Sequence, residues 1–194
     1  MRTFAAFILI FLSSQATLAQ SPVWYEGSLV LKTNEVVVGK LSVHPVHDIV
    51  LCKTEDALMV YTADKVQSFY FFDVQSNLNR KFISFQEKIN AFTTHALYEV
   101  VLSGEIKVLR KLIADFADPD NHRDSYHYFV RLREEIISIN KFRSKVYPHL
   151  ISASGSLSRR INETGWNPNV HADIILIIDY YNREVRSKSI LARN

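Results

Sequence analysis

The chain has 194 residues, enough for one well-formed hydrophobic core and within the usual range of a single domain. Hydrophobic residues make up 47% of it, with only 5 Gly and 5 Pro, so the composition excludes a disordered chain and indicates a globular one. The formal net charge of +3, from 23 basic and 20 acidic residues, is too balanced for a nucleic-acid partner.

The N-terminus has the order of a secretory signal peptide. Arg2 supplies a positive charge, Phe4–Leu12 is apolar, and Thr17 and Ala19 are small residues at the −3 and −1 positions of a cleavage site before Gln20. The apolar run is shorter than the about 20 residues that span a bilayer. We therefore expect an exported chain with no transmembrane segment in its mature part and, since no cysteine follows the cut, no lipid anchor. A buried N-terminal helix is the alternative.

Cys52 is the only cysteine. An exported animal protein of this size would more often carry disulfides, so the predicted compartment is bacterial, either periplasmic or extracellular. Cys52 lies in the strand-like run DIVLCK, where we expect a small buried apolar residue. A catalytic thiol is the alternative, and it would need a base nearby.

From Val23 to about Ile139 the pattern has period 2 and is rich in β-branched and aromatic residues, as strands require. The connections are short, and Ser103 and Gly104 fit a tight hairpin, so we expect antiparallel neighbours in a meander or small barrel. Four aromatic residues in a row, Phe69 to Phe72, predict a strand that is covered on both faces. The predicted strands are VWYEGSLVLK, VVVGKLSV, DIVLCK, LMVYTA, VQSFYFFD, RKFISF, LYEVVL, EIKVLRKLI and YHYFVRLREEIISI.

The pattern becomes helical after Asn140. Pro148 is expected to end or kink the first of two or three short helices, and Asn169 to cap the last. The final ten residues, VRSKSILARN, are polar and basic and are expected to fray. The helical spacing is carried by Phe142, Val146, Leu157, Ile161, Val170, Ile174, Ile177 and Tyr181.

These patterns predict an α+β fold, an antiparallel bent sheet or small-barrel-like β region followed by a short C-terminal helical cap. The predicted division is a signal peptide at 1–19, a β-rich domain at 20–139, a helical cap packed on it at 140–184, and a flexible basic tail at 185–194.

Two resemblances accompany this pattern. The N-terminal half, in LVLKTNEVVVGKLSVHPVHDIVL and VYTADKVQSFYF, is similar to the two motifs of Sm-like small barrels. This similarity implies a strongly bent topology, whereas the RNA-binding residues of that family have no counterparts here. Most of the mature chain resembles small exported β-rich proteins of Bacteroidetes, a family that implies export and brings no known activity. The second resemblance rests on Trp24, Gly27, Val30, Gly39, Leu41, Val66, Phe69, Phe71, Asp73, Asn79, Arg80, Phe82, Tyr98 to Leu102, Gly104, Ile106, Leu109 and Arg110.

The segment HPVHD places His44 and His47 on either side of Pro45, followed by Asp48. Two histidines so close could belong to a metal site, but a structural zinc site needs four ligands and a catalytic one three. Proline and aspartate are typical turn residues, so we predict a surface turn between VVVGKLSV and DIVLCK and assign no metal ligand. The other histidines lack ligand spacing: His95, His122, His127, His149 and His171.

The segment DFADPDNHRD is rich in aspartate but fails as a calcium loop, because Arg123 and Phe129 stand where an EF-hand needs Gly and Glu. A long hairpin loop is expected there, with weak calcium binding as the alternative. The aspartates concerned are Asp115, Asp118, Asp120 and Asp124. Asp73 and Arg80 flank the turn QSNLN, and we predict a structural pair across it, with Asp73 as a pocket residue as the alternative.

Functional motifs are missing from the sequence: it contains no G-x-S-x-G elbow, P-loop, dinucleotide fingerprint or H-E-x-x-H. We therefore assign no catalytic or cofactor-binding residue and no cofactor. The leading hypothesis is a non-enzymatic envelope protein that binds an envelope protein or glycan or has a structural role. The alternatives are a weak metal-binding carrier and a hydrolase with a histidine–aspartate pair drawn from His47, Asp48, Asp73 and His127, which would have to meet in one pocket.

Overall fold

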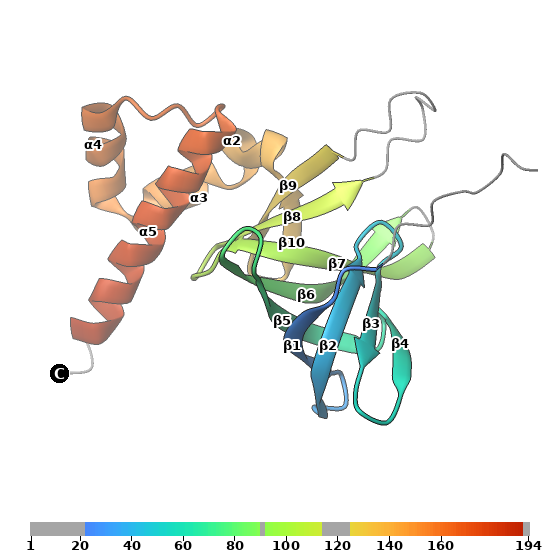
Figure 1. Ribbon diagram of the computed structural model, residues 1–194. Helices are drawn as coiled ribbons and strands as arrows, with labels where there is room; N and C mark the ends of the chain where they lie inside the picture. The colour runs from blue at the N-terminus through green and yellow to red at the C-terminus, as the bar shows by residue number, and fades with distance from the viewer. Residues whose placement is uncertain (1–21, 90–91, 114–124, 192–194) are drawn as a thin grey trace, which may run out of the picture.

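The computed structural model describes residues 22–89, 92–113 and 125–191 (Figure 1). The predicted signal peptide and the aspartate-rich segment with its calcium alternative lie outside these residues. The described elements are β1 (Tyr25–Leu31), β2 (Val36–His44), β3 (Ile49–Lys53), β4 (Leu58–Thr62), β5 (Val66–Asp73), β6 (Leu78–Ile89), β7 (Phe92–Leu102), β8 (Lys107–Ile113), β9 (Ser125–Leu132), β10 (Glu135–Ser138), the 3-10 turn η1 (Ile139–Lys141), α2 (Phe142–Lys145), α3 (Tyr147–Ala153), α4 (Gly155–Thr164) and α5 (His171–Leu191).

The strands form one sheet in the order β10-β9-β8-β7-β6-β5-β1-β2-β3-β4, and each neighbouring pair is antiparallel. The helices follow the last strand and lie beside the β8–β10 end of the sheet (Figure 1). The predicted α+β fold, a bent antiparallel sheet with a helical cap, is confirmed. The sheet ends in two separate edge strands, β4 and β10, so it is open and its ladder does not close into a barrel.

The β1–β5 part of the sheet bends around its own core. Gly27 permits the bend, because a Cβ atom at this position would lie 2.4 Å from the carbonyl oxygen of Tyr70 on the next strand. Stacked rings fill the interior, with Phe69 and Phe82 centroids 4.7 Å apart. Cys52 is fully buried in the same cluster, as expected.

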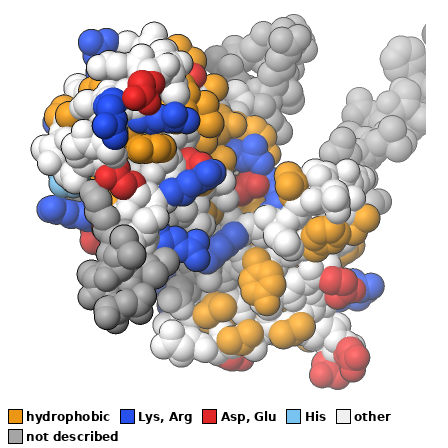
Figure 2. Space-filling view, turned by 90° about the vertical axis from the view of Figure 1, so that its left-hand side faces the viewer, with side chains coloured by type: hydrophobic (Ala, Val, Ile, Leu, Met, Phe, Trp, Pro, Cys, Tyr) orange, Lys and Arg blue, Asp and Glu red, His pale blue; other side chains and the backbone are white. Residues whose placement is uncertain are grey.

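The aromatic strand β5 has only one covered face. Phe69 and Phe71 are 1% and 2% exposed, whereas Tyr70 and Phe72 are 56% and 42% exposed. The prediction that both faces are covered is therefore wrong, because the helical layer packs at the other end of the sheet. Figure 2 shows exposed hydrophobic side chains lying between charged ones of both signs on one face of the molecule.

The helical cap packs on the β8–β10 end through aliphatic residues such as Ile174 and Ile177 of α5. Asn182, which is buried, fixes the position of α5. Its Oδ1 accepts from the backbone N–H of Ile106 at 2.9 Å, and its Nδ2 donates to the Ile106 carbonyl at 2.8 Å. Gly104 makes this approach possible, since a Cβ atom there would lie 2.3 Å from the Asn182 amide.

Two predictions about the cap need correction. Helix α5 continues to Leu191, so residues 185–191 of the expected flexible tail are helical. The last helix begins at His171, one residue later than an N-cap at Asn169 requires. The role of Pro148 is confirmed, because α2 has ended before it and it lies in the first turn of α3.

Candidate functional site

The sheet divides in the middle of β7. β7 pairs with β6 out to Phe92, and β8 pairs with β9 out to Ile113. The pairing of β7 with β8, however, runs from Leu102 back to Glu99. Beyond Glu99 the β6–β7 hairpin and the β8–β9 hairpin separate (Figure 1). This separation leaves room for side chains and for a turn from another part of the chain.

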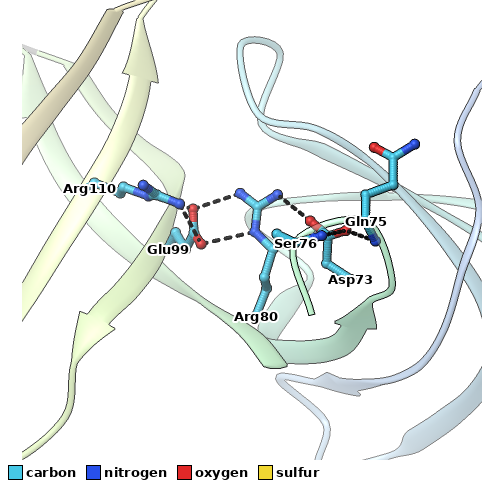
Figure 3. Close-up of polar contacts among 6 residues, drawn as sticks. All are labelled: Asp73, Gln75, Ser76, Arg80, Glu99 and Arg110. Carbon is cyan, nitrogen blue, oxygen red and sulfur yellow. Dashed lines mark hydrogen bonds and ion pairs between the residues drawn. The ribbon is translucent and has the colours of Figure 1, made fainter. Parts of the chain in front are cut away.

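Glu99 lies at the point of division, between arginines of both neighbouring strands (Figure 3). Arg80 donates from Nε to Glu99 Oε1 at 2.9 Å and from Nη2 to Oε2 at 2.7 Å. Arg110 donates from Nε to Oε2 at 2.7 Å and from Nη2 to Oε1 at 3.0 Å. Two bidentate arginine pairs, a strong and directional contact, thus share one carboxylate.

All members of this network are charged at neutral pH. Burial opposes ionisation of Glu99, but its hydrogen bonds to Arg80 and Arg110 and their charges outweigh burial, so its pKa lies below the ordinary value. The Glu99 carboxylate in turn raises the pKa of both guanidinium groups. The Ser76 side chain, together with nearby backbone N–H groups, lowers the pKa of Asp73. Two arginines and two carboxylates leave the network with no net charge.

The predicted Asp73–Arg80 pair is confirmed, with Asp73 Oδ2 3.6 Å from Arg80 Nη1. It is the weaker contact of Arg80, however, because the carboxylate of Asp73 mainly caps the turn after β5 by accepting from Gln75 N at 3.1 Å and Ser76 N at 3.3 Å. Sequence reasoning missed Glu99, the main partner. A signal was present, since Glu99 shares a strand face with the buried Leu97.

The HPVHD segment forms the predicted turn. β2 ends at His44, β3 begins at Ile49, and His47 N donates to His44 O at 3.1 Å. Asp48 takes a left-handed φ of 54°, which aspartate tolerates better than most residues. Its side chain does not accept a hydrogen bond within the turn. Its Oδ1 instead accepts from the backbone N–H of Leu97 on β7 at 2.7 Å.

A second polar cluster holds this turn against the divided strands. Lys111 Nζ of β8 lies 3.4 Å from Asp48 Oδ2 and 3.6 Å from Glu87 Oε2. Tyr98 donates its hydroxyl to Glu87, and burial followed by this contact raises its pKa. Asp48 therefore links the β2–β3 turn to both hairpins that separate at Glu99.

The turn borders a cleft of about 550 Å³. The buried rings of Phe71 and Phe82 contribute to its lining beside the guanidinium group of Arg80. Leu112 and Tyr126 line it from the β8–β9 hairpin. The remaining lining residues come from the chain before β1, from β1, from the end of β2 and from the β2–β3 turn: Pro22, Val23, Tyr25, Ser42, Val43, His44, Pro45, Val46 and His47.

Two tyrosines of the cleft have one ring face supported by a neighbour. The ring of Tyr25 stacks on Phe71 with centroids 4.5 Å apart. The ring of Tyr126 lies 4.4 Å from the guanidinium carbon of Arg110, and 42% of this residue is exposed. Both tyrosines are therefore held in fixed positions at the border of the cleft.

The residues proposed for a hydrolase do not form a catalytic pair. His47 and Asp48 border a second hollow of about 400 Å³, but the carboxylate of Asp48 is held by Leu97 N and Lys111. Asp73 caps its own turn, and His127 lies on β9 opposite Lys111. In the described ranges no histidine is hydrogen-bonded to a carboxylate.

The alternatives of a thiol nucleophile and a metal site gain no support. Cys52 is fully buried, and burial raises the pKa of its thiol. Within residues 22–89, 92–113 and 125–191, no three side chains of His, Cys, Asp or Glu are grouped closely enough to hold a metal ion.

The described part of the chain also contains no helix with the length and apolar character needed to cross a membrane.

Comparison with known proteins finds no match to a family model, to a curated protein or to a solved structure.

Proposed function

We propose that the protein is an exported, non-enzymatic binding module of the bacterial envelope whose ligand site is the cleft beside the β2–β3 turn. The observation that carries this proposal is the convergence on one cleft of aromatic rings and a guanidinium group from β1, β5, β6 and β9. Its volume of about 550 Å³ falls within the range of about 300–1,000 Å³ typical of small-ligand sites.

The arrangement favours binding over catalysis. Arg80, the charged group of the cleft, is already engaged by Glu99 and Asp73 and is not free to stabilise a developing charge. The histidine side chains of the cleft, His44 and His47, have no carboxylate partner among the described residues that would make them general bases.

The proposed location rests on the sequence. The N-terminal order of positive, apolar and small residues supports export, and the single cysteine supports a bacterial compartment. Basic and acidic side chains are interspersed on the face in Figure 2, which agrees with a partner other than nucleic acid. An envelope protein or an envelope glycan is the proposed partner.

The test is retention of envelope components by the immobilised chain from Gln20 onward. Protein and polysaccharide fractions are passed separately over the wild type, Tyr126→Ala and Tyr70→Ala. Tyr126 borders the cleft, whereas Tyr70 is a matched control, another exposed tyrosine, on the outer face of β5. We expect the wild type and Tyr70→Ala to retain one of the fractions, and Tyr126→Ala to let the same fraction pass unbound. Equal retention by all three would contradict the proposal.

A further inference from the structure

The chemistry of the cleft also indicates a class of ligand. We infer that it binds an uncharged saccharide, an inference that rests on the proposed function and narrows it. Three observations carry it: the neutral charge network, the two supported tyrosine rings and the free imidazole groups of the β2–β3 turn.

The first observation argues against an anionic ligand. Arg80 Nε and Nη2 are bound to Glu99, and Nη1 faces Asp73. Arg110 also gives Nε and Nη2 to Glu99. A phosphate or carboxylate that bound the Nε–Nη2 edge of either arginine would therefore have to displace Glu99 from a bidentate pair. Since the charges of the four side chains cancel, the cleft offers no net attraction to an anion.

The second observation favours a ring with a C–H face. Tyr25 and Tyr126 border the cleft, and each has one ring face supported, by Phe71 and by Arg110 respectively. The face of an aromatic ring is electron-rich and attracts the weakly positive C–H groups of an apolar surface. A pyranose ring presents such a surface on one side and hydroxyl groups around its edge. Fixed aromatic rings bind it without loss of side-chain freedom.

The third observation concerns hydrogen bonding at the border. The imidazole rings of His44 and His47 make no hydrogen bond to any other described residue, and both residues are exposed. A neutral imidazole offers one donor and one acceptor. A sugar hydroxyl also donates and accepts, so the two groups match. A site built for anions would present donors alone, as free arginine and lysine side chains do.

The test begins with an array of uncharged and acidic glycans, followed by calorimetry with the tightest uncharged oligosaccharide and with hexagalacturonate as the acidic probe. We expect binding of the uncharged probe that changes little between about 50 and about 500 mM salt, where the attraction of exposed charges is screened. Tyr126→Ala should weaken it by about tenfold or more, while Tyr126→Phe, which keeps the ring, and Tyr70→Ala should bind as the wild type does.

Several outcomes would overturn the inference. The first is an array on which no uncharged glycan binds. The second is binding of hexagalacturonate alone, in a salt-sensitive way. The third is binding of the uncharged oligosaccharide by Tyr126→Ala as tightly as by the wild type. Circular dichroism of Tyr126→Ala separates loss of the ring from loss of folding, and His44→Ala, a change at an exposed turn, provides a second variant with the same expected direction. If a protein fraction is retained in a Tyr126-dependent way and no glycan binds, the proposed function stands and the saccharide inference fails. If nothing is retained, both fail.

Discussion

The two ends of the sheet bury their hydrophobic cores in different ways. The β1–β5 end bends around stacked aromatic rings, with Phe69, Phe71 and Phe82 at its centre. The β8–β10 end is covered by a second layer, helix α5, through aliphatic side chains such as Ile174 and Ile177. Large rings fill the interior of a bent single layer, whereas branched aliphatic chains suit the contact of a helix with a sheet.

The candidate site lies between these two ends of the sheet. The cleft lies where the two ends meet, at the separation of β7 from β8, and Phe71 and Phe82 of the β1–β5 core form part of its wall. Each end supplies part of the lining, Tyr25 from β1 and Tyr126 from β9. Glu99 joins the strands at this junction.

The largest effect is expected from Glu99→Gln. The change removes the carboxylate that Arg80 and Arg110 share and leaves Arg80 with only its weaker contact to Asp73. Breaking a buried ion pair costs about 3–5 kcal/mol. The arginine side chains keep 21% and 27% exposure, so we expect the lower end, about 3 kcal/mol, measured as the free energy of unfolding in urea. The control is Glu134→Gln, whose pair with Arg131 is at the surface with Glu134 86% exposed, and whose cost should stay under about 1 kcal/mol. Equal costs would show that the junction is not a buried network.

A smaller and more local effect is expected from Asn182→Leu. The change deprives the buried N–H and C=O groups of Ile106 of their partners, at a cost of about 1–3 kcal/mol. The two tryptophans report the ends separately, since Trp166 lies in the cap near Tyr180 and Trp24 precedes β1. The fluorescence of Trp166 is followed in a Trp24→Phe background, and that of Trp24 in a Trp166→Phe background. We expect Asn182→Leu to lower the urea midpoint of unfolding reported by Trp166 more than the midpoint reported by Trp24.

The exposed Asn162 of α4 gives the control for this experiment, because Asn162→Leu changes no buried partner and should alter stability by less than about 0.5 kcal/mol. Equal shifts of both tryptophan midpoints in Asn182→Leu would mean that the two ends unfold as one unit and that the cap has no stability of its own to lose.

The smallest effect is the pH dependence that Glu99 contributes. Burial opposes its ionisation, but the two guanidinium groups hold its pKa below the ordinary value of 4.5 in the folded chain. The unfolded chain therefore binds this proton more readily. The stabilisation is fully present above pH 4.5 and is lost as the pH falls from there through the lower folded pKa. We expect the wild type to lose more stability than Glu99→Gln when the pH is lowered from above 4.5 to below it. The measurement is the free energy of unfolding in urea on each side of pH 4.5. Parallel losses would contradict this assignment.

The elements could be predicted from the sequence because their periods are local properties. The alternation of apolar and polar residues predicted the strands, and helical spacings such as Ile174 to Ile177 predicted the helical cap. Which face of a strand is covered is not local, so Phe72 was expected inside and is exposed. The continuation of α5 was also missed, although Arg183 pairs with Asp179 one turn earlier, a contact that supports a polar helix.

The candidate site was less predictable, because it depends on strand register and on the bend of the sheet. Glu99 lies 19 residues from Arg80 and 11 from Arg110 in sequence, and a shift of one residue would place them on opposite faces. Asp48 reaches Leu97 across 49 residues. The turn HPVHD was correctly placed between two strands, but its position as a wall of the cleft follows from these distant contacts.

The separation of β7 from β8 has a consequence for solubility. Two strands that part inside a sheet expose backbone groups to which a strand of another molecule could add, and such edges promote aggregation. The carboxylate of Asp48 occupies the N–H of Leu97 at this edge, and Lys111 places a charge beside it. Charged side chains at an edge are a common protection against such pairing. The turn that borders the cleft thus also blocks this edge against the addition of a strand from another molecule.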